Sequence, residues 1–240
     1  MSVRRILLPG LTLPVDDYAA FAAELAGQTV VLDTLAVPVT GSPAELRAGV
    51  ALPGPPYELI GHSVGALAAL EWAAEHPREV SRLVLLDPSD PWGTPVPSAL
   101  GGLLGRVLTG LVGLISLSPP AARALGRWGR RTVLGMYGVT DDPLPRDRVD
   151  ELFGTRTALR STARQVAGVP ALIDRVQTLL DSGFTTPNDV VLSSLDGAPA
   201  DGVATSRLAD FLGVEVILVP GTHLFPMTHP ESTAAALTRA

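Results

Sequence analysis

The sequence predicts an α/β protein in which helices flank a mostly parallel sheet. Short apolar runs alternate with helical patterns in the first and last parts of the 240-residue chain, as expected when both faces of a parallel sheet are covered. One of these runs ends in the pattern Gly-x-Ser-x-Gly, and an alanine-rich helical stretch follows it directly. Between the two alternating parts lies a long helical region without a strand pattern, which predicts an inserted cap.

Local signals mark where the expected helices begin and end. Residues 16–26 start with two aspartates, follow helical apolar spacing and end before Gly27. Ser42 is placed as the N-cap of a second helix, with Pro43 at the first helical position and Glu45 positioned for a capping box. The expected strands are residues 4–8, 29–32, 59–60, 82–86, 190–195 and 214–219.

The order of these patterns predicts two parts. Residues 1–90 and 184–240 are expected to form the core, and residues 91–183 are expected to form a helical cap or lid. Within the insertion, residues 99–117 approach the length of a membrane span, but Arg106 and five glycines argue against one. Two interpretations stay open for this stretch: an apolar lid that moves over a pocket, and an ordinary buried cap helix.

The composition excludes several classes of function. The chain contains no cysteine, which excludes a disulfide framework, a cysteine nucleophile and a thiolate metal site. Its net charge of −6 argues against a nucleic-acid partner. The apolar run within residues 1–10 is too short for a signal peptide, and we expect a cytoplasmic protein.

Ser63 is the expected nucleophile. It lies at the centre of Gly61-His62-Ser63-Val64-Gly65, between a strand and a helix, where a sharp turn lifts its hydroxyl clear of the sheet. The two glycines are needed because strand and helix crowd a turn this tight. A serine hydroxyl alone is a poor nucleophile, so it also needs a general base that an acid orients.

His223 is the expected general base among the four histidines. It follows the last expected strand, in a loop that can fold back over the sheet edge towards Ser63. His62 points away from Ser63 by strand alternation, and His76 is expected to be structural. His223 and His229 lack a third ligand at motif spacing, so we expect neither a metal nor another cofactor.

Three aspartates compete for the role of the orienting acid. Asp196 follows the expected strand 190–195 and is preferred, because the order serine, aspartate, histidine places the acid late in the sheet. Asp87 ends the strand after the serine helix and is the alternative, and Asp201 is a third candidate. Each of them could instead cap a helix or a turn.

The oxyanion of a tetrahedral intermediate needs two N–H donors. Val64, immediately after Ser63, is expected to provide one of them. The other is expected in the loop after the first strand, where Leu11 is the candidate because Pro9 has no N–H.

Together these residues resemble the α/β-hydrolase superfamily over essentially the whole chain. The matching pieces are Pro9-Gly10, Gly61-His62-Ser63-Val64-Gly65, Glu75-His76-Pro77, residues 83–87, Pro220-Gly221-Thr222-His223 and Pro230-Glu231. The resemblance implies Ser63 as nucleophile, His223 as base and Asp196 as acid, with a cap inserted at Pro91. It also implies about six strands, because the chain starts directly at the strand before the oxyanion loop.

Three positions depart from the pattern of that superfamily. Pro9-Gly10 stands where His-Gly usually precedes the oxyanion residue, and Thr222 stands where a glycine commonly precedes the histidine. The usual Gly-x-x-Asp before the acid reads Ser194-Leu195-Asp196.

The expected function is hydrolysis of an ester or thioester of an apolar acyl substrate, through an acyl-Ser63 intermediate. One alternative is an acyltransferase, lyase or cyclase of specialised metabolism that uses the same triad, since a cap that excludes water favours another acceptor. The other alternative is a binding protein that keeps the pocket without turnover, against which an intact set of Ser63, Asp196 and His223 argues.

Two groups of arginines in the expected cap could meet a partner. Each group shares one helical face: Arg123, Arg127, Arg130 and Arg131 in the first, and Arg156, Arg160 and Arg164 in the second. Such faces are most often solvated. The alternative is a docking surface for an acidic group, such as an acyl-carrier arm or a phosphate.

Overall fold

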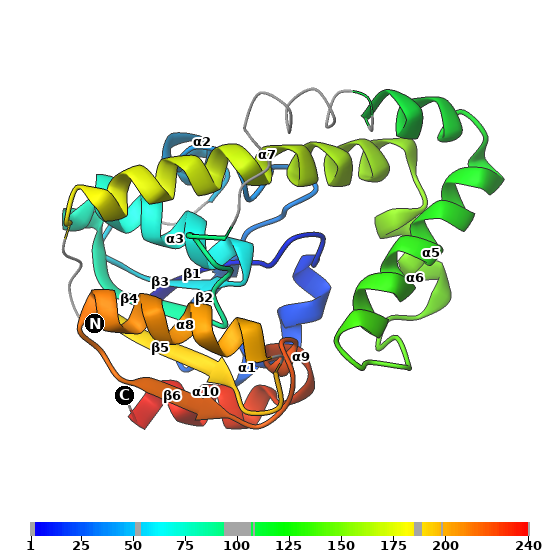
Figure 1. Ribbon diagram of the computed structural model, residues 1–240. Coiled ribbons are helices and arrows are strands. Elements are labelled where there is room, and N and C mark those ends of the chain that lie inside the picture. The colour runs from blue at the N-terminus through cyan, green and yellow to red at the C-terminus, as the bar shows by residue number, and fades with distance from the viewer. Residues whose placement is uncertain are drawn as a thin grey trace.

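A computed structural model of the protein describes residues 3–50, 54–93, 107, 109–184, 189–197 and 199–239. Its centre is a six-stranded sheet with the strand order β2-β1-β3-β4-β5-β6 (Figure 1). The strands are β1 (Arg4–Leu8), β2 (Gln28–Val31), β3 (Tyr57–His62), β4 (Val80–Leu86), β5 (Asp189–Ser194) and β6 (Val216–Val219). Every neighbouring pair is parallel, which confirms the predicted sheet and the number of its strands.

The strand order reverses between β1 and β3. The chain adds β2 on one side of β1 and all later strands on the other side, and open α/β sheets bind ligands at such a reversal, beyond the carboxyl ends of the strands. Leu8 pairs with Gly61, and His62 pairs with Leu86. This register brings the loops after β1, β3 and β4 together at one edge of the sheet.

Helices cover both faces of the sheet, and each face has its own buried apolar cluster. One cluster joins the strands to α2 (Pro43–Ala48), α3 (Val64–Glu75), the second half of α7 (Arg156–Asp181) and α8 (Pro199–Leu212). The other cluster joins them to α1 (Ala19–Glu24), α9 (Phe225–Thr228) and α10 (Pro230–Arg239). The sheet is therefore the middle layer of three.

The helix starts follow the sequence signals closely. The capping box of α2 is present: the Ser42 hydroxyl accepts from the Glu45 N–H, and the Glu45 side chain accepts from the Ser42 N–H. The helix expected over residues 16–26 is instead divided into a 3-10 turn, η1 (Val15–Tyr18), and α1. The division comes at Tyr18, which leaves the helical conformation (φ −105°, ψ 1°) where its ring enters the core.

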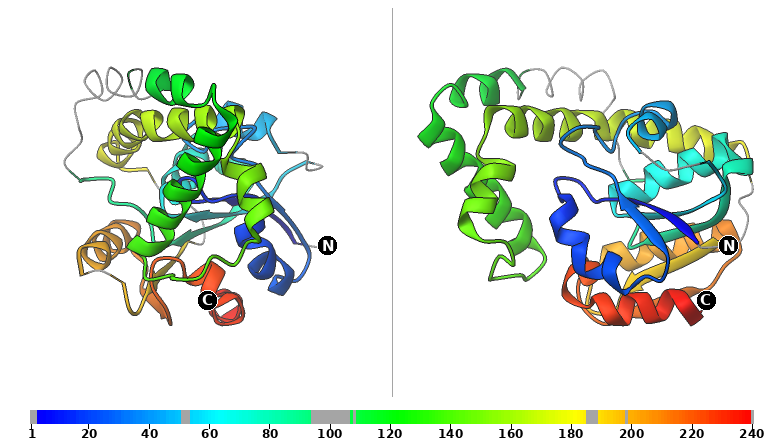
Figure 2. Two further views of the ribbon diagram at one scale, coloured as in Figure 1. Left: turned by 90° about the vertical axis from the view of Figure 1, so that its right-hand side faces the viewer. Right: turned by 180° about the vertical axis from the view of Figure 1, so that it is seen from behind.

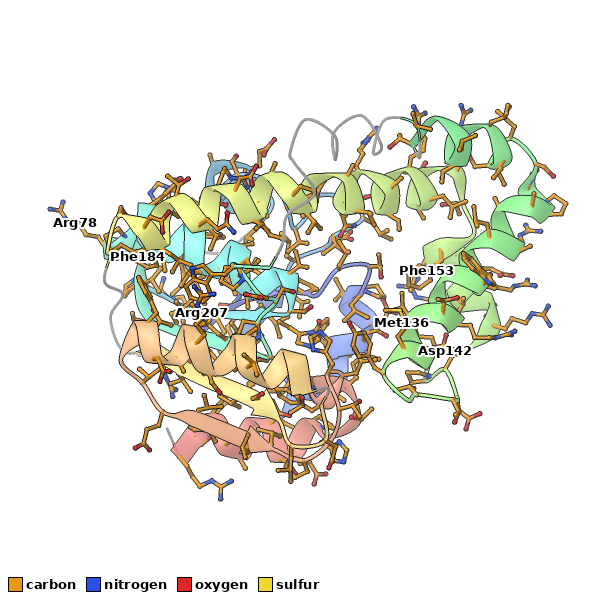
Figure 3. The ribbon with its side chains drawn as sticks, viewed as in Figure 1. Arg78, Met136, Asp142, Phe153, Phe184 and Arg207 are labelled. Carbon is orange, nitrogen blue, oxygen red and sulfur yellow. The ribbon has the colours of Figure 1, made fainter. Side chains whose placement is uncertain are left out.

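Several helical segments project beyond the sheet, among them α5 (Pro119–Met136), α6 (Arg146–Phe153) and the first half of α7 (Figures 1 and 2). We call these three segments the cap helices. Figure 3 labels Met136, Asp142 and Phe153 in this part and Phe184 and Arg207 on the distant side of the molecule. The second half of α7 packs against α3, so this single helix belongs to both parts, and the boundary expected at residue 183 stays a prediction.

The expected lid over residues 99–117 lies partly outside the described residues. Residues 109–115 are helical, whereas residues 99–106 and 108 are not described. Across the ranges that the structure does describe, no helix combines the length and the apolar character needed to cross a membrane.

The first group of cap arginines does not form a single solvated face. Arg130 is 3% exposed and bonds to Asp17 and Asp142, and Arg127 pairs with Asp150. The expectation of a shared surface is therefore wrong at Arg130, because docking of α5 on η1 encloses this side chain. The exposed members of the two groups are Arg123, Arg131, Arg156, Arg160 and Arg164.

Candidate active site

Ser63 lies in a strained turn between β3 and α3. Its backbone has φ 55° and ψ −121°, a combination that costs a non-glycine residue about 1–3 kcal/mol. A Cβ on Gly65 would lie 2.2 Å from the carbonyl oxygen of Leu8, and one on Gly61 would lie 2.4 Å from that of Gly65. Glycine at both positions therefore lets strand and helix approach closely enough to present Ser63 at the sheet edge.

Asp87 and His223 form a buried pair beside this turn. Nδ1 of His223 lies 2.8 Å from Oδ2 of Asp87. Because an ionised carboxylate only accepts hydrogen bonds, Nδ1 carries the ring proton and Nε2 keeps the lone pair. The hydroxyls of Ser193 and Ser194, at the end of β5, also donate to Asp87 at 3.0 Å each. The backbone N–H of Ser194 donates to it as well, at 3.3 Å, so four donors from two further segments fix one carboxylate.

These donors keep Asp87 ionised. Burial alone raises the pKa of the Asp87 carboxyl, but the hydrogen bond and charge of His223 and the two serine hydroxyls outweigh it, so the pKa lies below its usual value. Asp87 itself has a positive φ of 43° directly after β4. Ser63 and Asp87 thus both have positive φ, and the side chains of both make polar contacts at this edge of the sheet.

The acidic partner of His223 is Asp87, not Asp196, the residue preferred from the sequence. The exposed Asp196 is engaged elsewhere: its N–H donates to the carbonyl of Gly221 at 3.0 Å, and its carboxylate accepts from the Gly221 N–H at 3.1 Å. These bonds tie the end of β5 to the loop after β6, which is a turn role. The side chain of Asp201 lies outside the part of the chain that the structure describes.

His62 belongs to a buried chain of hydrogen bonds behind Ser63. Its Nε2 lies 2.8 Å from the carbonyl oxygen of His223, which can only accept, so Nε2 carries the proton. Nδ1 then accepts from the hydroxyl of Tyr18 at 2.6 Å, and the same hydroxyl accepts from the Gly10 N–H at 2.8 Å. The chain links the loop after β1 to the backbone of His223.

The His62 ring in this chain is neutral. Burial, followed by repulsion from His223, lowers the pKa of His62 to about 3. A neutral ring at this place adds no positive charge beside His223. His62, expected inside the turn, is the last residue of β3, and the sequence carries no signal for its contact with Tyr18.

The loop after β1 packs directly on Ser63. A Cβ on Gly10 would lie 3.1 Å from Nδ1 of His62 and 3.4 Å from the Cβ of Ser63. Leu11 follows Gly10, and Val64 opens α3, where first-turn N–H groups have no acceptor within the helix. Both candidate oxyanion donors therefore belong to segments next to the serine: Val64 follows it in the chain, and Leu11 follows Gly10, which packs on it.

The Ser63 hydroxyl lies 3.3 Å from the hydroxyl of Ser89. Among the hydrogen bonds of the described residues, none joins Ser63 to His223. Such bonds are often long or absent in a free enzyme and tighten when substrate is bound. The structure therefore brings together His223 and Asp87 and places Ser63 in the turn directly after His62, whose ring centroid lies 4.9 Å from that of His223.

An apolar cavity of about 300 Å³ lies among the cap helices. Its wall includes Leu125 and Trp128 of α5, Phe153 of α6 and Leu159 of α7. Thr12, in the loop after β1 and next in sequence to Leu11, also lines it. This residue connects the cavity to the loop that packs on Ser63.

The remaining histidines have other surroundings. His76 ends α3, and Nδ1 of the exposed His229 lies 2.9 Å from the Thr228 hydroxyl. In the described ranges, no group of three or more histidine, aspartate or glutamate side chains is arranged to hold a metal ion.

Several residues of the site were missed from the sequence, among them Tyr18, Ser89, Tyr137 and two serines of β5. Ser193 and Ser194 carry a readable signal, because two hydroxyls follow the apolar run 190–192. Tyr137, at the end of α5, stacks on His223, and nothing in its local sequence indicates this.

The chain is similar to known proteins of one fold. Residues 50–111 match a family model described as the alpha/beta hydrolase fold. A thermophilic esterase from Thermogutta terrifontis has a TM-score of 0.72 at 17% identity, with 100% of this chain and 89% of that chain covered. An alpha/beta hydrolase fold protein from Burkholderia ambifaria has a TM-score of 0.69 at 16% identity, with 100% and 91% covered.

A thioesterase domain from the curacin biosynthetic pathway is also similar, with a TM-score of 0.60 at 17% identity and with 99% and 91% of the two chains covered. None of the curated proteins compared with the chain matches its sequence. At these identities the likeness concerns the fold. The parallel sheet, its reversal between β1 and β3, the serine turn and the family match agree, and the protein is an α/β-hydrolase-fold protein.

Proposed function

We propose that the protein is a serine hydrolase that cleaves an ester or thioester of an apolar acyl group. The observation that carries this proposal is the contact between His223 and Asp87 beside the strained turn of Ser63. A serine at such a turn, a histidine with a free lone pair and a carboxylate on its other nitrogen are the parts that acyl transfer to serine requires.

In the first half of the reaction, the Ser63 hydroxyl rotates from Ser89 to Nε2 of His223 and attacks the acyl carbonyl carbon. The serine proton passes to Nε2, and Asp87 stabilises the imidazolium that results. The carbonyl oxygen becomes an oxyanion, which accepts from the N–H groups of Val64 and Leu11. The tetrahedral intermediate then expels the alcohol or thiol, which takes the proton from Nε2.

In the second half, water attacks the acyl-Ser63 carbonyl. His223 takes a proton from the water and returns it to the Ser63 oxygen as the acid leaves. The neutral state of His62 favours both halves, because a second cation beside the imidazolium would oppose each proton transfer to His223.

The cavity among the cap helices supports an apolar acyl group. Its wall is built mainly from aliphatic and aromatic side chains, and Thr12 brings it to the loop that holds Leu11. An acyl chain held there therefore adjoins the loop after β1, which packs on Ser63. The similar structures named as an esterase and a thioesterase are consistent with either leaving group.

The test combines covalent labelling with turnover. A fluorophosphonate probe is expected to label the wild type at Ser63, as located by peptide mass spectrometry, and to leave Ser63→Ala unlabelled. Ser89→Ala is the matched control, because it removes the neighbouring hydroxyl and keeps the proposed nucleophile. Activated esters and thioesters from acetyl to palmitoyl should be hydrolysed, with longer chains favoured over acetyl.

A folded wild-type protein that the probe does not label would refute the proposal. Equal labelling of wild type and Ser63→Ala would place the reactive group elsewhere. Product analysis with an added alcohol or amine separates hydrolysis from acyl transfer, since an acyl acceptor other than water yields an ester or amide.

A further inference from the structure

The end of α5 lies against the ring of His223. Tyr137, the residue directly after α5, stacks on the imidazole with ring centroids 4.5 Å apart and an angle of 27° between the planes. The His62 ring is also close, with centroids 4.9 Å apart and an angle of 37°. The imidazole thus has an aromatic neighbour from the cap helices as well as one from the sheet.

A hydrogen bond holds the same two segments together. The hydroxyl of Thr222 donates to the backbone carbonyl of Tyr137 at 2.8 Å. The last carbonyls of a helix have no donor within the helix, so Thr222 supplies the partner that Tyr137 needs there. Glycine at position 222 could not supply it, and Thr222 is the residue immediately before His223.

The end of α5 is also anchored in the core. Leu134 is buried in the apolar cluster on the α10 face, and Val133, Tyr137 and Val139 pack against that cluster. The N–H groups of Tyr137 and Val139 both donate to the carbonyl of Leu134, which closes the helix end. The Tyr137 ring therefore belongs to a part of α5 that is packed into the core.

We propose that Tyr137 and Thr222 form a clip through which α5 positions the imidazole of His223 for proton transfer. The clip rests on the proposed function, because it acts through the general base. Asp87 holds His223 by one nitrogen, and a ring held at one atom can still pivot about that bond. Stacking on Tyr137 restricts the pivot and keeps Nε2 directed at Ser63, so Tyr137 is a positioning residue rather than a catalytic one.

The geometry can be tested without any substrate. In a carbon–proton NMR spectrum of the imidazole groups, His223 is identified by the signal that is lost in His223→Gln. The Tyr137 ring current should shift the His223 ring protons, and Tyr137→Phe should keep this shift while Tyr137→Leu removes it. A His223 signal that is the same in the wild type and in Tyr137→Leu would overturn the clip, whatever the activity of the protein.

The function of the clip is tested by steady-state kinetics on an activated ester. We expect Tyr137→Leu to lower kcat about ten- to hundredfold with little change in KM, because a misdirected base slows the chemical step and leaves binding intact. Tyr137→Phe keeps an aromatic ring against His223, so its kcat should stay within about twofold of the wild-type value. Met136→Ala is the matched control, since Met136 is the adjacent residue and is 66% exposed.

The hydroxyl of the clip is tested in the same way. Thr222→Ser should keep kcat, and Thr222→Val should lower it. The double variant of Tyr137→Leu and Thr222→Val should lose less than the product of the two single losses, because both changes open one clip.

Other outcomes overturn the clip. A loss confined to KM would make Tyr137 a substrate contact, and unchanged kcat in Tyr137→Leu with an intact melting temperature would make the stacking incidental. If the wild type has no hydrolase activity, the proposed function fails, and the NMR comparison still decides whether the clip exists.

Discussion

At the scale of single residues, Asp87 is the carboxylate that contacts His223, and we propose that it orients this ring. It binds Nδ1 of His223, whereas Asp196 binds only the backbone of Gly221 among the described contacts. We expect Asp87→Asn to lower kcat by roughly 10³–10⁴-fold, because an amide does not stabilise the imidazolium and can hold the histidine in the wrong tautomer. Steady-state kinetics on an activated ester measures this.

Asp196→Asn is the matched control for that change. Its remaining carbonyl oxygen can still accept from the Gly221 N–H, so kcat should stay within about twofold of the wild type. If kcat fell more in Asp196→Asn than in Asp87→Asn, the orienting acid would be Asp196, as preferred from the sequence.

His62 makes the stability of the protein depend on pH. Its pKa is lowered from 6.5 to about 3 by burial and by His223, so the unfolded chain binds a proton between these values and the folded chain does not. The contribution of His62 is complete above pH 6.5 and is lost as the pH falls towards 3. The loss therefore grows through this whole pH window and amounts to several kcal/mol at its lower end.

Denaturant unfolding at a series of pH values between 3 and 7 measures this dependence. His62→Gln should flatten it relative to the wild type, while His229→Gln, which changes an exposed histidine, should follow the wild type. Parallel curves for the wild type and His62→Gln would show that His62 has the same pKa in the folded and the unfolded protein.

Some residues of the candidate site could be predicted from the sequence and others could not, for a physical reason. Ser63 lies in a local pattern, because one turn conformation demands glycine on both sides of it. The choice between Asp87 and Asp196 has no local basis, since each follows a parallel strand and both strands end at the same edge. It depends on which side chain turns inward, and Ser193 and Ser194 settle that by their bonds to Asp87.

At the scale of elements, close packing of α3 against the end of β1 sets the position of the serine turn. A Cβ on Gly65 would lie 2.2 Å from the Leu8 carbonyl and 2.4 Å from that of Pro9, and both are backbone atoms that cannot move aside. We expect Gly65→Ala to lower the free energy of unfolding by about 3 kcal/mol, the upper end of the usual cost of overpacking. Thermal or denaturant unfolding measures the change.

Gly135→Ala in α5 is the matched control. A Cβ there meets nothing within 4 Å, so the substitution should stabilise the protein by about 0.5–1 kcal/mol through the higher helix propensity of alanine. Similar changes in the two variants would mean that the turn relaxes to accept a side chain.

The sheet was predictable at this scale, and the packing of the cap helices was not. Strands β1 to β6 are short apolar runs, and the period and order of such runs determine a parallel sheet. The cap helices have helical patterns too, but their docking depends on pairs far apart in the sequence, such as Arg130 with Asp17. That pairing also explains why Arg130 was wrongly expected in a solvated face.

At the scale of the whole molecule, two adjacent carboxylates of η1 receive the cap helices. Asp17 binds Arg130 of α5 through two hydrogen bonds of 2.6 and 2.7 Å, and Asp16 binds Arg148 of α6 at 2.8 Å. Asp17 precedes Tyr18, whose hydroxyl holds Gly10 and His62. Docking of the cap is thus connected to the loop that carries the proposed oxyanion donor Leu11.

The two arginines differ in exposure, which makes them a matched pair for a test. Arg130 has a side chain 2% exposed, and Arg130→Met leaves the buried Asp17 carboxylate without its partner. We expect this variant to lose about 3–5 kcal/mol of unfolding free energy in denaturant titrations, and activity to fall with it. The Arg148 side chain is 38% exposed, so Arg148→Met should change stability little.

The charge of Asp17 is tested by a double variant. Adding Asp17→Asn to Arg130→Met should recover part of the lost unfolding free energy, because it removes the unpaired charge. A double variant no more stable than Arg130→Met would show that the charge is not what holds the cap helices to η1.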